Sequence, residues 1–294
     1  MLHHLHANPT KPERVVVIGA GFIGGAIARF ARDAGADAVA LGRSSVDLLA
    51  TDAAEKLAAQ LRPNDAVVFV SALAPAKTAA QLTLNLQMAE AACRAFQTVA
   101  PAHLLYISSD AVYADDANPV NESSALAPST LHGMMHAARE LMFRSEYRGP
   151  FAALRPTLVF GADDPHSGYG PNRFRRQGAA GGPITIFGEG EEKRDHIVVE
   201  DVARLAVRML WRRSTGALNA TTGVATPFCE IARRVAAQFA PEVVVQSVPR
   251  PGPRPHLLHR FFDVTGRLKA FPDFHPEPLA AALARVHREA QAAR

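Results

Sequence analysis

The sequence VVVIGAGFIGGAIARF (residues 15–30) decides the fold. Its first four residues, 15–18, are β-branched and predict a short buried strand. The glycine-rich turn of residues 19–24 follows, and apolar side chains then recur at helical spacing as far as Phe30. The order of strand, G-x-G-x-x-G turn and helix is typical of a site that binds a dinucleotide. The alternative is a glycine turn that serves packing alone.

The glycines and the start of the helix indicate how a cofactor would be held. Gly19 permits the tight turn, Gly21 lets the backbone approach a pyrophosphate, and Gly24 lets the helix and strand pack closely. The first N–H groups of the helix then face the phosphates. Ligands of such a fold bind at the carboxyl ends of the strands. We therefore expect the cofactor to contact Gly19, Gly21, Phe22, Ile23, Gly24, Ser71 and Ala72.

Composition and charge exclude several classes of protein. The chain has 294 residues, 48% hydrophobic and 20% charged, which suits one large α/β domain or a domain with a smaller cap. A net charge of +4, without a basic block interleaved with aromatic residues, argues against a nucleic-acid partner. No apolar run reaches the roughly 18 residues of a membrane span. Cys93 and Cys229 indicate no disulfide framework and predict a cytoplasmic location.

Strands and helices alternate through the first half of the chain. We expect strands at 15–18, 38–41, 66–70, 103–107 and 151–154, and helices at 51–61, 78–99 and 128–147. This rhythm predicts an α/β fold with a Rossmann-like, doubly wound parallel sheet. The dinucleotide-binding domain is expected over residues 13–160, after a disordered tail at 1–12 that lacks the apolar core of a signal peptide.

The second half, residues 161–294, is expected to form a small C-terminal substrate-binding cap, interleaved with the last elements of the sheet. Gly- and Pro-rich loops are expected at 161–183, with a short helix, and at 248–260. The remaining elements are expected as strands at 184–187, 196–199 and 217–220, and helices at 200–212, 227–239 and 278–292.

The end of the second predicted strand favours NADP over NAD as the cofactor. NAD enzymes usually place an acid there to hold the ribose 2′-hydroxyl. Here the strand ends in LGRSS, without a carboxylate, and Arg43 and Ser44 can instead bind a 2′-phosphate. The alternative is that Arg43 is a solvated loop residue. Asp47 lies near enough in sequence to leave NAD open.

Several further segments, together with the glycine motif, resemble the extended short-chain dehydrogenase/reductase family, the NAD-dependent epimerase/dehydratase group. YISSDAVY (106–113) is also similar to a segment of dTDP-4-dehydrorhamnose reductases. The likeness covers nearly the whole chain. The other segments that carry it are LRPTLVFG (154–161), GPITIFGEGEEKRDHIVVEDVARLA (182–206) and PRPGPRPHLLHRFFDVTGRLKAF (249–271).

The resemblance implies hydride transfer at a nicotinamide and a substrate carried on a nucleotide diphosphate, usually a sugar. Ser109 falls where the family has a Ser or Thr that hydrogen-bonds the reacting oxygen. Arg194, and less strongly Arg260, fall where an arginine grips the diphosphate. The alternative for Arg194 is an ion pair with Glu192 or Asp195. Asp110 is assigned to the substrate site as the single acid after Ser109, and dehydratases have an acid pair there.

The catalytic pair departs from the family pattern. NESSALAPSTLHGMMHAARE (121–140) resembles the family's run around Y-x-x-x-K, and alignment on Pro128, Gly133 and Glu140 places His132 at the tyrosine and His136 at the lysine. The two positions are four residues apart, so they share one face of a helix. Imidazole can also move a proton near neutral pH.

Three interpretations of the histidine pair stay open. In the first, Ser109, His132 and His136 are catalytic, with His132 as acid/base and His136 as anchor of the nicotinamide ribose. In the second, the protein is catalytically impaired and binds NAD(P) or a nucleotide as a regulator or scaffold. In the third, the histidines are structural or half of a zinc site, although no third ligand is evident and no metal is predicted. Tyr113 is the nearby phenol considered as a replacement for the tyrosine.

Family members commonly form homodimers through the helices expected here at 78–98 and 128–147, so a homodimer is predicted. Leu82, Leu86, Ala89 and Ala92 form an apolar stripe at helical spacing on the first of them. The alternative is that this stripe faces the sheet.

Overall fold

The glycine-motif segment folds as predicted: β2 (Arg14–Ile18) leads through the turn into α1 (Phe22–Asp33). Strand β2 pairs in parallel with β3 (Asp37–Leu41) on one side and β4 (Asp65–Phe69) on the other. The β-branched run is fully buried because both faces of the sheet are covered by helices. The computed structural model describes residues 1–252 and 257–292.

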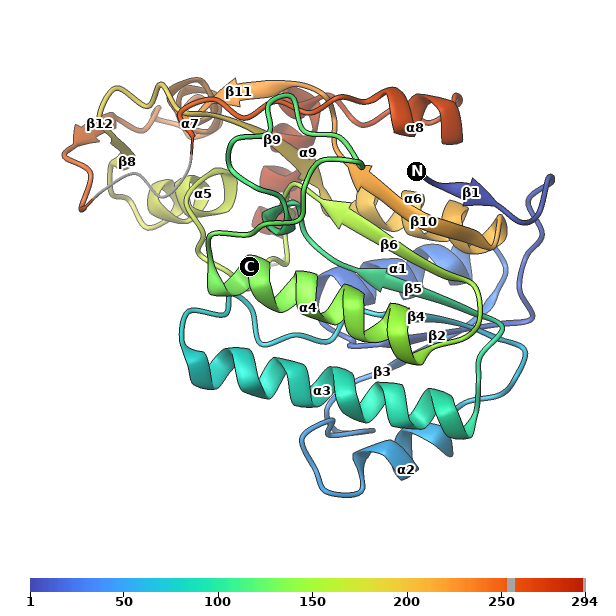
Figure 1. Cartoon of the computed structure of the whole chain (residues 1–294). Helices are drawn as coiled ribbons and strands as arrows, with labels where there is room; N and C mark the ends of the chain where they lie inside the picture. Colours follow the sequence, from blue (N-terminus) through green and yellow to red (C-terminus); the bar gives the residue numbers. More distant parts are fainter. Residues whose placement is uncertain (253–256, 293–294) are drawn as a thin grey trace.

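A seven-stranded sheet organises the molecule, in the order β1-β10-β6-β5-β4-β2-β3 (Figure 1). The remaining strands are β5 (His103–Ile107), β6 (Phe151–Pro156), β10 (Ser214–Ala220) and β1 (His3–His4). All neighbours are parallel except β1, which is antiparallel to β10. This confirms the doubly wound α/β fold. The strand order reverses between β2 and β4, and ligands of such sheets bind in the crevice at that point.

Helices cover the sheet in two layers. Side chains alternate along β2, so Val15 and Val17 pack with α1 and α6 (Val199–Trp211), whereas Val16 and Ile18 join the opposite core. That second core is completed by three helices that lie side by side in Figure 1. They are α2 (Ala53–Ala58), α3 (Ala79–Thr98) and α4 (Leu131–Glu146).

The chain after β6 builds a smaller unit with its own core. This core includes Phe174, Ile231 and Val286, all buried. Two small sheets, β11-β9-β7 and β12-β8, frame it, while α6 and β10 return to the main sheet. The elements of this part, besides α6 and β10, are β7 (Leu158–Phe160), α5 (Pro171–Ala179), β8 (Ile184–Phe187), β9 (Lys193–Val198), β11 (Ala225–Pro227), α7 (Phe228–Ala236), β12 (Val245–Val248), α8 (Thr265–Ala270) and α9 (Leu279–Ala292).

The expectation of a disordered tail over residues 1–12 is wrong for its strand β1. Both ring nitrogens of His4 make hydrogen bonds. Nδ1 is 2.9 Å from Ser214 Oγ, and Nε2 is 3.0 Å from the Ala270 carbonyl oxygen. These two contacts fix the segment on β10. Within the predicted loop 248–260, residues 253–256 lie outside the described part of the chain. None of the helices in the described ranges is both long and apolar enough to cross a membrane.

A buried ion pair ties α4 to the sheet. Arg155 of β6 donates two hydrogen bonds to Glu140, at 2.8 Å and 2.6 Å, and both side chains are almost fully buried. Ser108 Oγ donates a third bond to the same carboxylate at 2.7 Å. Bidentate geometry with further hydrogen bonds is what a buried pair needs to offset its desolvation. The pair therefore fixes the position of α4 over β5 and β6.

Substitution Glu140→Gln is expected to lower the free energy of unfolding by about 3–5 kcal/mol, because Arg155 keeps its charge without a carboxylate partner. Urea unfolding followed by circular dichroism measures this loss. Glu230→Gln is the matched control. Glu230 pairs with Arg234 on the exposed face of α7, at 2.8 Å, and its loss is expected to cost at most about 1 kcal/mol. Equal costs for the two variants would contradict the role given to Glu140.

Candidate functional site

The three glycines after β2 serve two different purposes. Gly19 has a φ of +114°, and a Cβ there would lie 2.7 Å from the backbone nitrogen of Ser71. A Cβ on Gly24 would lie 1.8 Å from the Gly19 carbonyl oxygen. Gly21, in contrast, would meet no atom within 4 Å. Gly19 and Gly24 are therefore required for packing, whereas Gly21 leaves open space in front of the helix.

The N-terminus of α1 offers the donors that an anion needs. Gly21 is the residue that caps α1, no side chain accepts from the first N–H groups there, and the first turn contains no acid. Ser71 lies across the turn, since its N–H donates to the Ile18 carbonyl at 2.9 Å. Ala72 follows it. An open cradle, uncapped N–H groups and the helix dipole fit the pyrophosphate of a dinucleotide.

Arg43 lies at the other end of the predicted cofactor site, directly after β3. Its side chain is 80% exposed, and its Nε is 3.1 Å from Asp47 Oδ2. Asp47 Oδ1 accepts from the Leu49 N–H at 3.1 Å, and these hydrogen bonds lower the pKa of Asp47. Arg43 is thus a surface residue held by Asp47, with the rest of its guanidinium directed to solvent. Ser44 follows it and is exposed.

Gly133 brings the start of α4 against the turn that follows β5. A Cβ on Gly133 would lie 2.1 Å from the Ala111 carbonyl oxygen and 2.6 Å from Pro128 Cβ. Ala111 belongs to the short helix η1 (Asp110–Val112), which Ser109 caps by accepting from the Ala111 N–H at 3.1 Å. The glycine therefore places His132 and Ser109 at the same edge of the sheet.

The two histidines of α4 stack edge to face. Their ring centroids are 4.8 Å apart and the ring planes meet at 87°. His132 is half-buried, and its Nδ1 is fully buried without a hydrogen-bond partner. His136 is buried, and its Nδ1 is 2.7 Å from the hydroxyl of Tyr106. Burial is the main cause that lowers the pKa of both rings, so both are neutral at pH 7.

Two residues beside the histidines were not predicted from the sequence. Tyr106 points from β5 toward His136, and Arg139 lies one turn further along α4, with no exposed surface. Arg139 donates to the Asn85 and Ser71 carbonyls, at 2.9 Å and 2.8 Å. The signal that could have found it is helical spacing, since 132, 136 and 139 share one face.

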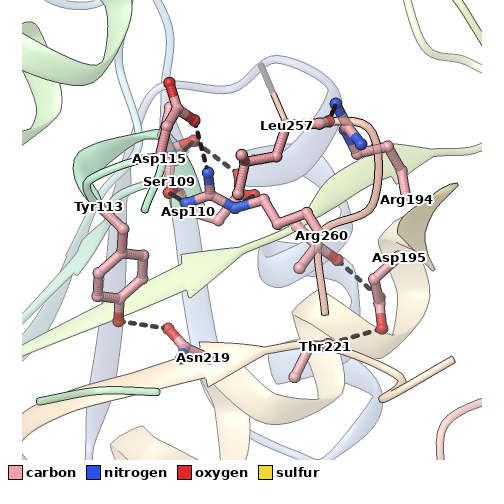
Figure 2. Close-up of polar contacts among 12 residues, drawn as sticks. Ser109, Asp110, Tyr113, Asp115, Arg194, Asp195, Asn219, Thr221, Leu257 and Arg260 are labelled. Carbon is pink, nitrogen blue, oxygen red and sulfur yellow. Dashed lines mark hydrogen bonds and ion pairs between the residues drawn. The ribbon is translucent and has the colours of Figure 1, made fainter. Parts of the chain in front are cut away.

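Tyr113 does not take the place of the missing tyrosine. Its hydroxyl donates to Asn219 Oδ1 at 2.7 Å (Figure 2). The same hydroxyl accepts from Arg155 at 2.8 Å, so both its donor and its acceptor capacity are used within the protein. Burial raises the pKa of Tyr113 to about 12. The phenol is a part of the network around Glu140, so the suggestion that it replaces the tyrosine is wrong.

Arg260 is buried between two acids at the edge of η1 (Figure 2). Its Nη1 is 2.9 Å from Asp115 Oδ1, and its Nε is 4.0 Å from Asp110 Oδ2. Its Nη2 donates to the Asp110 carbonyl at 3.3 Å. Asp110 and Arg260, both assigned from the sequence to the substrate site, are therefore neighbours.

Arg194 lies in β9 and is also engaged within the protein. Its Nη2 is 2.5 Å from Glu192 Oε1 and donates to the Leu257 carbonyl at 2.7 Å. The ion pair with Glu192, the alternative considered from the sequence, is thus present. Asp195 accepts instead from Thr221 Oγ1 at 2.7 Å (Figure 2). A diphosphate role for Arg194 stays a prediction, and it requires the anion to compete with Glu192.

Metal binding by the histidine pair gains no support from its surroundings. Within residues 1–252 and 257–292, no group of three or more His, Cys, Asp or Glu side chains is placed to hold a metal ion.

Comparison with known proteins identifies the family of the chain. Residues 15–221 match the family model described as the NAD dependent epimerase/dehydratase family. The dTDP-4-dehydro-6-deoxy-D-allose reductase of Streptomyces bikiniensis is 30% identical over 154 residues, which are 50% of this chain and 45% of that protein. The match therefore spans less than half the length of this relative.

Solved structures with the same fold cover nearly the whole chain. UDP-glucose 4-epimerase of Thermus thermophilus, in complex with NAD, has a TM-score of 0.81 at 22% identity, over 96% of this chain and 100% of the other. UDP-N-acetylglucosamine 4-epimerase of Methanobrevibacter ruminantium, in complex with UDP-N-acetylmuramic acid, has a TM-score of 0.81 at 22% identity, over 97% and 100%. The family model covers most of the chain, from β2 to the end of β10. The chain therefore belongs to the NAD dependent epimerase/dehydratase family.

Proposed function

We propose that the protein is an NAD(P)-dependent oxidoreductase or epimerase that acts on a nucleotide-linked sugar or a similar hydroxy or keto compound. The observation that carries this proposal is the stacked histidine pair of α4, which Gly133 brings against η1 and Ser109, together with the open, uncapped turn at Gly21. Relatives named as nucleotide-sugar epimerases and a reductase support the substrate class.

A nicotinamide bound at this turn would supply hydride transfer to and from the substrate carbon. His132 is neutral and can accept the hydroxyl proton while the C–H bond breaks and the carbonyl forms. Because His132 Nδ1 is buried, proton exchange with a ligand passes through Nε2. A reductase runs the same step in reverse, with protonated His132 donating to the alkoxide oxygen.

Ser109 is positioned to hold the reacting oxygen. Its Oγ accepts from the Ala111 N–H, while its own proton has only a long contact of 3.5 Å with Asp110 Oδ1. The hydroxyl can therefore donate to a ligand oxygen and stabilise negative charge there. Only one acid, Asp110, follows Ser109, whereas dehydratases have an acid pair there. This favours reduction or epimerisation over dehydration as the reaction.

We propose NADP as the preferred cofactor, with NAD as the alternative. Arg43 supports NADP, because the exposed part of its guanidinium is available for a 2′-phosphate and no carboxylate ends β3. Asp47 supports NAD, since it already neutralises part of that charge.

The proposal includes a cytoplasmic homodimer that forms through α3 and α4. Leu131, Met134 and Leu141 on α4 are exposed apolar side chains beside α3, with Leu141 64% exposed. On α3, Ala89 and Ala92 are buried in the core, so only the Leu82 and Leu86 part of the predicted stripe is left to reach a partner. Cys93 and Cys229 are free thiols, as suits a reducing compartment.

Substitution Arg43→Ala is expected to weaken NADPH binding by about 10-fold to 100-fold, because a charge-assisted hydrogen bond to the 2′-phosphate is lost. NADH binding is expected to change less than about threefold, since NADH lacks that phosphate. Titration of nicotinamide fluorescence measures both affinities. An equal loss for the two cofactors, or no loss for NADPH, would contradict the NADP preference.

Substitution His132→Phe is expected to lower turnover by at least about 100-fold, because the proton acceptor is removed, while cofactor affinity stays within a few-fold. Turnover is followed at 340 nm and by NMR of the sugar, with UDP- and dTDP-linked hydroxy and keto sugars as substrates. His275→Phe, at an exposed histidine before α9, is the control.

Unchanged turnover in His132→Phe would place the acid/base elsewhere. If the unaltered protein binds nicotinamide cofactors but exchanges hydride with none of these sugars, the regulator or scaffold alternative replaces the enzyme proposal.

A further inference from the structure

We propose that Tyr106 is a positioning residue that holds His136 as the neutral tautomer with its proton on Nε2, and that the buried cation of Arg139 acts on the same pair of histidines through its charge. His136 would then present a fixed donor to a hydroxyl of the bound ligand or cofactor. The tautomer itself follows from contacts within the protein. Its effect on turnover rests on the function proposed above.

The Tyr106 hydroxyl has one proton, and the hydrogen bond it makes is to His136 Nδ1. The phenol is fully buried in a core with Phe69 and Phe143, and its hydroxyl lies 2.7 Å from His136 Nδ1. Burial raises the pKa of Tyr106 above its usual value, so the phenol stays protonated. The bond between the two rings is therefore made either by the phenol proton or by a proton on Nδ1.

The surroundings of the Tyr106 hydroxyl decide between these two arrangements. Among the described residues, His136 Nδ1 is the one hydrogen-bond partner of this hydroxyl. A proton on Nδ1 would leave the buried phenol proton without an acceptor, which is costly, so the phenol donates. The Tyr106 proton then points to His136 Nδ1, which accepts it. A neutral imidazole that accepts at Nδ1 carries its proton on Nε2.

His136 stays neutral because its burial and two neighbouring groups disfavour an imidazolium. Burial, His132 and Arg139 all lower its pKa well below the ordinary value. No protein group in the described ranges hydrogen-bonds its Nε2, and this nitrogen is not among the fully buried unpaired atoms. The Nε2–H donor is thus left for a ligand.

Arg139 is also a buried cation without a carboxylate partner. No acid in the described part of the chain lies within ion-pair distance of it, and it is held by carbonyl oxygens and by the face of Phe69, 5.4 Å from the ring centroid. Desolvation of an unpaired charge is costly, which is a reason to expect a function for it. Its field reaches both histidines and lowers the pKa of each.

The tautomer is measured by long-range ¹H–¹⁵N NMR of the protein labelled at histidine. The His136 signals are identified by their loss in His136→Gln. The expected spectrum at pH 7.5 shows a protonated Nε2 and an unprotonated Nδ1. In Tyr106→Phe, which removes the hydroxyl and keeps the ring, a mixture of the two tautomers is expected.

Tyr147→Phe is the matched control for that spectrum. Tyr147 is another buried tyrosine of the same core, and its hydroxyl donates to the Pro101 carbonyl at 2.7 Å. This variant loses a comparable buried hydrogen bond but is expected to leave the His136 spectrum unchanged. A protonated Nδ1 in the unaltered protein, or the same spectrum in Tyr106→Phe, would overturn the proposal.

The charge of Arg139 is tested by the pH dependence of kcat/KM in the oxidation direction, which requires neutral His132. The acidic limb is expected below pH 6.5, because burial, His166 and Arg139 lower the pKa of His132. Arg139→Gln removes the cation, so the limb is expected to move to higher pH, whereas Arg139→Lys is expected to keep it. His166 pairs with Asp164 at 3.1 Å and is unchanged in both variants.

Tyr106→Phe is expected to lower kcat by roughly 10-fold to 100-fold at nearly unchanged KM, since a misplaced donor affects the reaction more than binding. An inactive protein that still shows the Nε2–H tautomer would defeat the proposed function and leave this inference intact. An active enzyme whose pH limb is the same in Arg139→Gln as in Arg139→Lys would contradict the electrostatic role. If Arg139→Gln does not fold, the Tyr106→Phe spectrum decides.

Discussion

The contact between Gly24 and the Gly19 carbonyl is the constraint on which the rest of the structure depends. A side chain at position 24 would lie 1.8 Å from that oxygen, so any other residue would push α1 away from β2. With glycine there, the helix starts directly at the carboxyl edge of the central strand. The change in strand order between β2 and β4 opens the sheet at the same edge. The packing of one turn thus leaves open space at the start of α1, and the uncapped N–H groups there suit an anion.

The charge of the site is arranged differently from what Y-x-x-x-K would give. A lysine at position 136 would bring a cation to the helix face itself, whereas here the face carries two neutral rings and the cation lies one turn deeper, on Arg139. Arg139 also donates to the carbonyl of Ser71, the residue that packs against the Gly19 turn. The same side chain therefore contacts the backbone at the proposed cofactor site and also lowers the pKa of His132 and His136. The ion pair of Glu140 and Arg155 fixes the position of α4 relative to β6.

Much of the fold could be predicted because it depends on local patterns. The β-branched run and the glycine turn specify β2 and α1. The spacing of four residues between His132 and His136 places both rings on one face of α4. Contacts between distant elements could not be predicted in this way. Tyr106 contacts His136 only because of the way α4 packs across β5. The Tyr113 hydroxyl is held by Arg155, which donates to it, and by Asn219, which accepts from it. That β1 is ordered likewise depends on a distant contact, since His4 hydrogen-bonds Ser214, 210 residues further along the chain.

The central claim is that the open space at Gly21 receives the pyrophosphate of a nicotinamide dinucleotide. The most direct measurement is the affinity of Gly21→Ala for NADPH and NADH, with thermal unfolding as a check on the fold. A Cβ at Gly21 meets no protein atom within 4 Å, so the fold is predicted to be as stable as before, and Gly168→Ala, at another glycine with open space, is the control. The added methyl group would occupy the place of the phosphates, so both affinities are predicted to fall by at least about tenfold, with no change in the control. A folded Gly21→Ala protein that binds both cofactors as tightly as the unaltered protein would contradict the account.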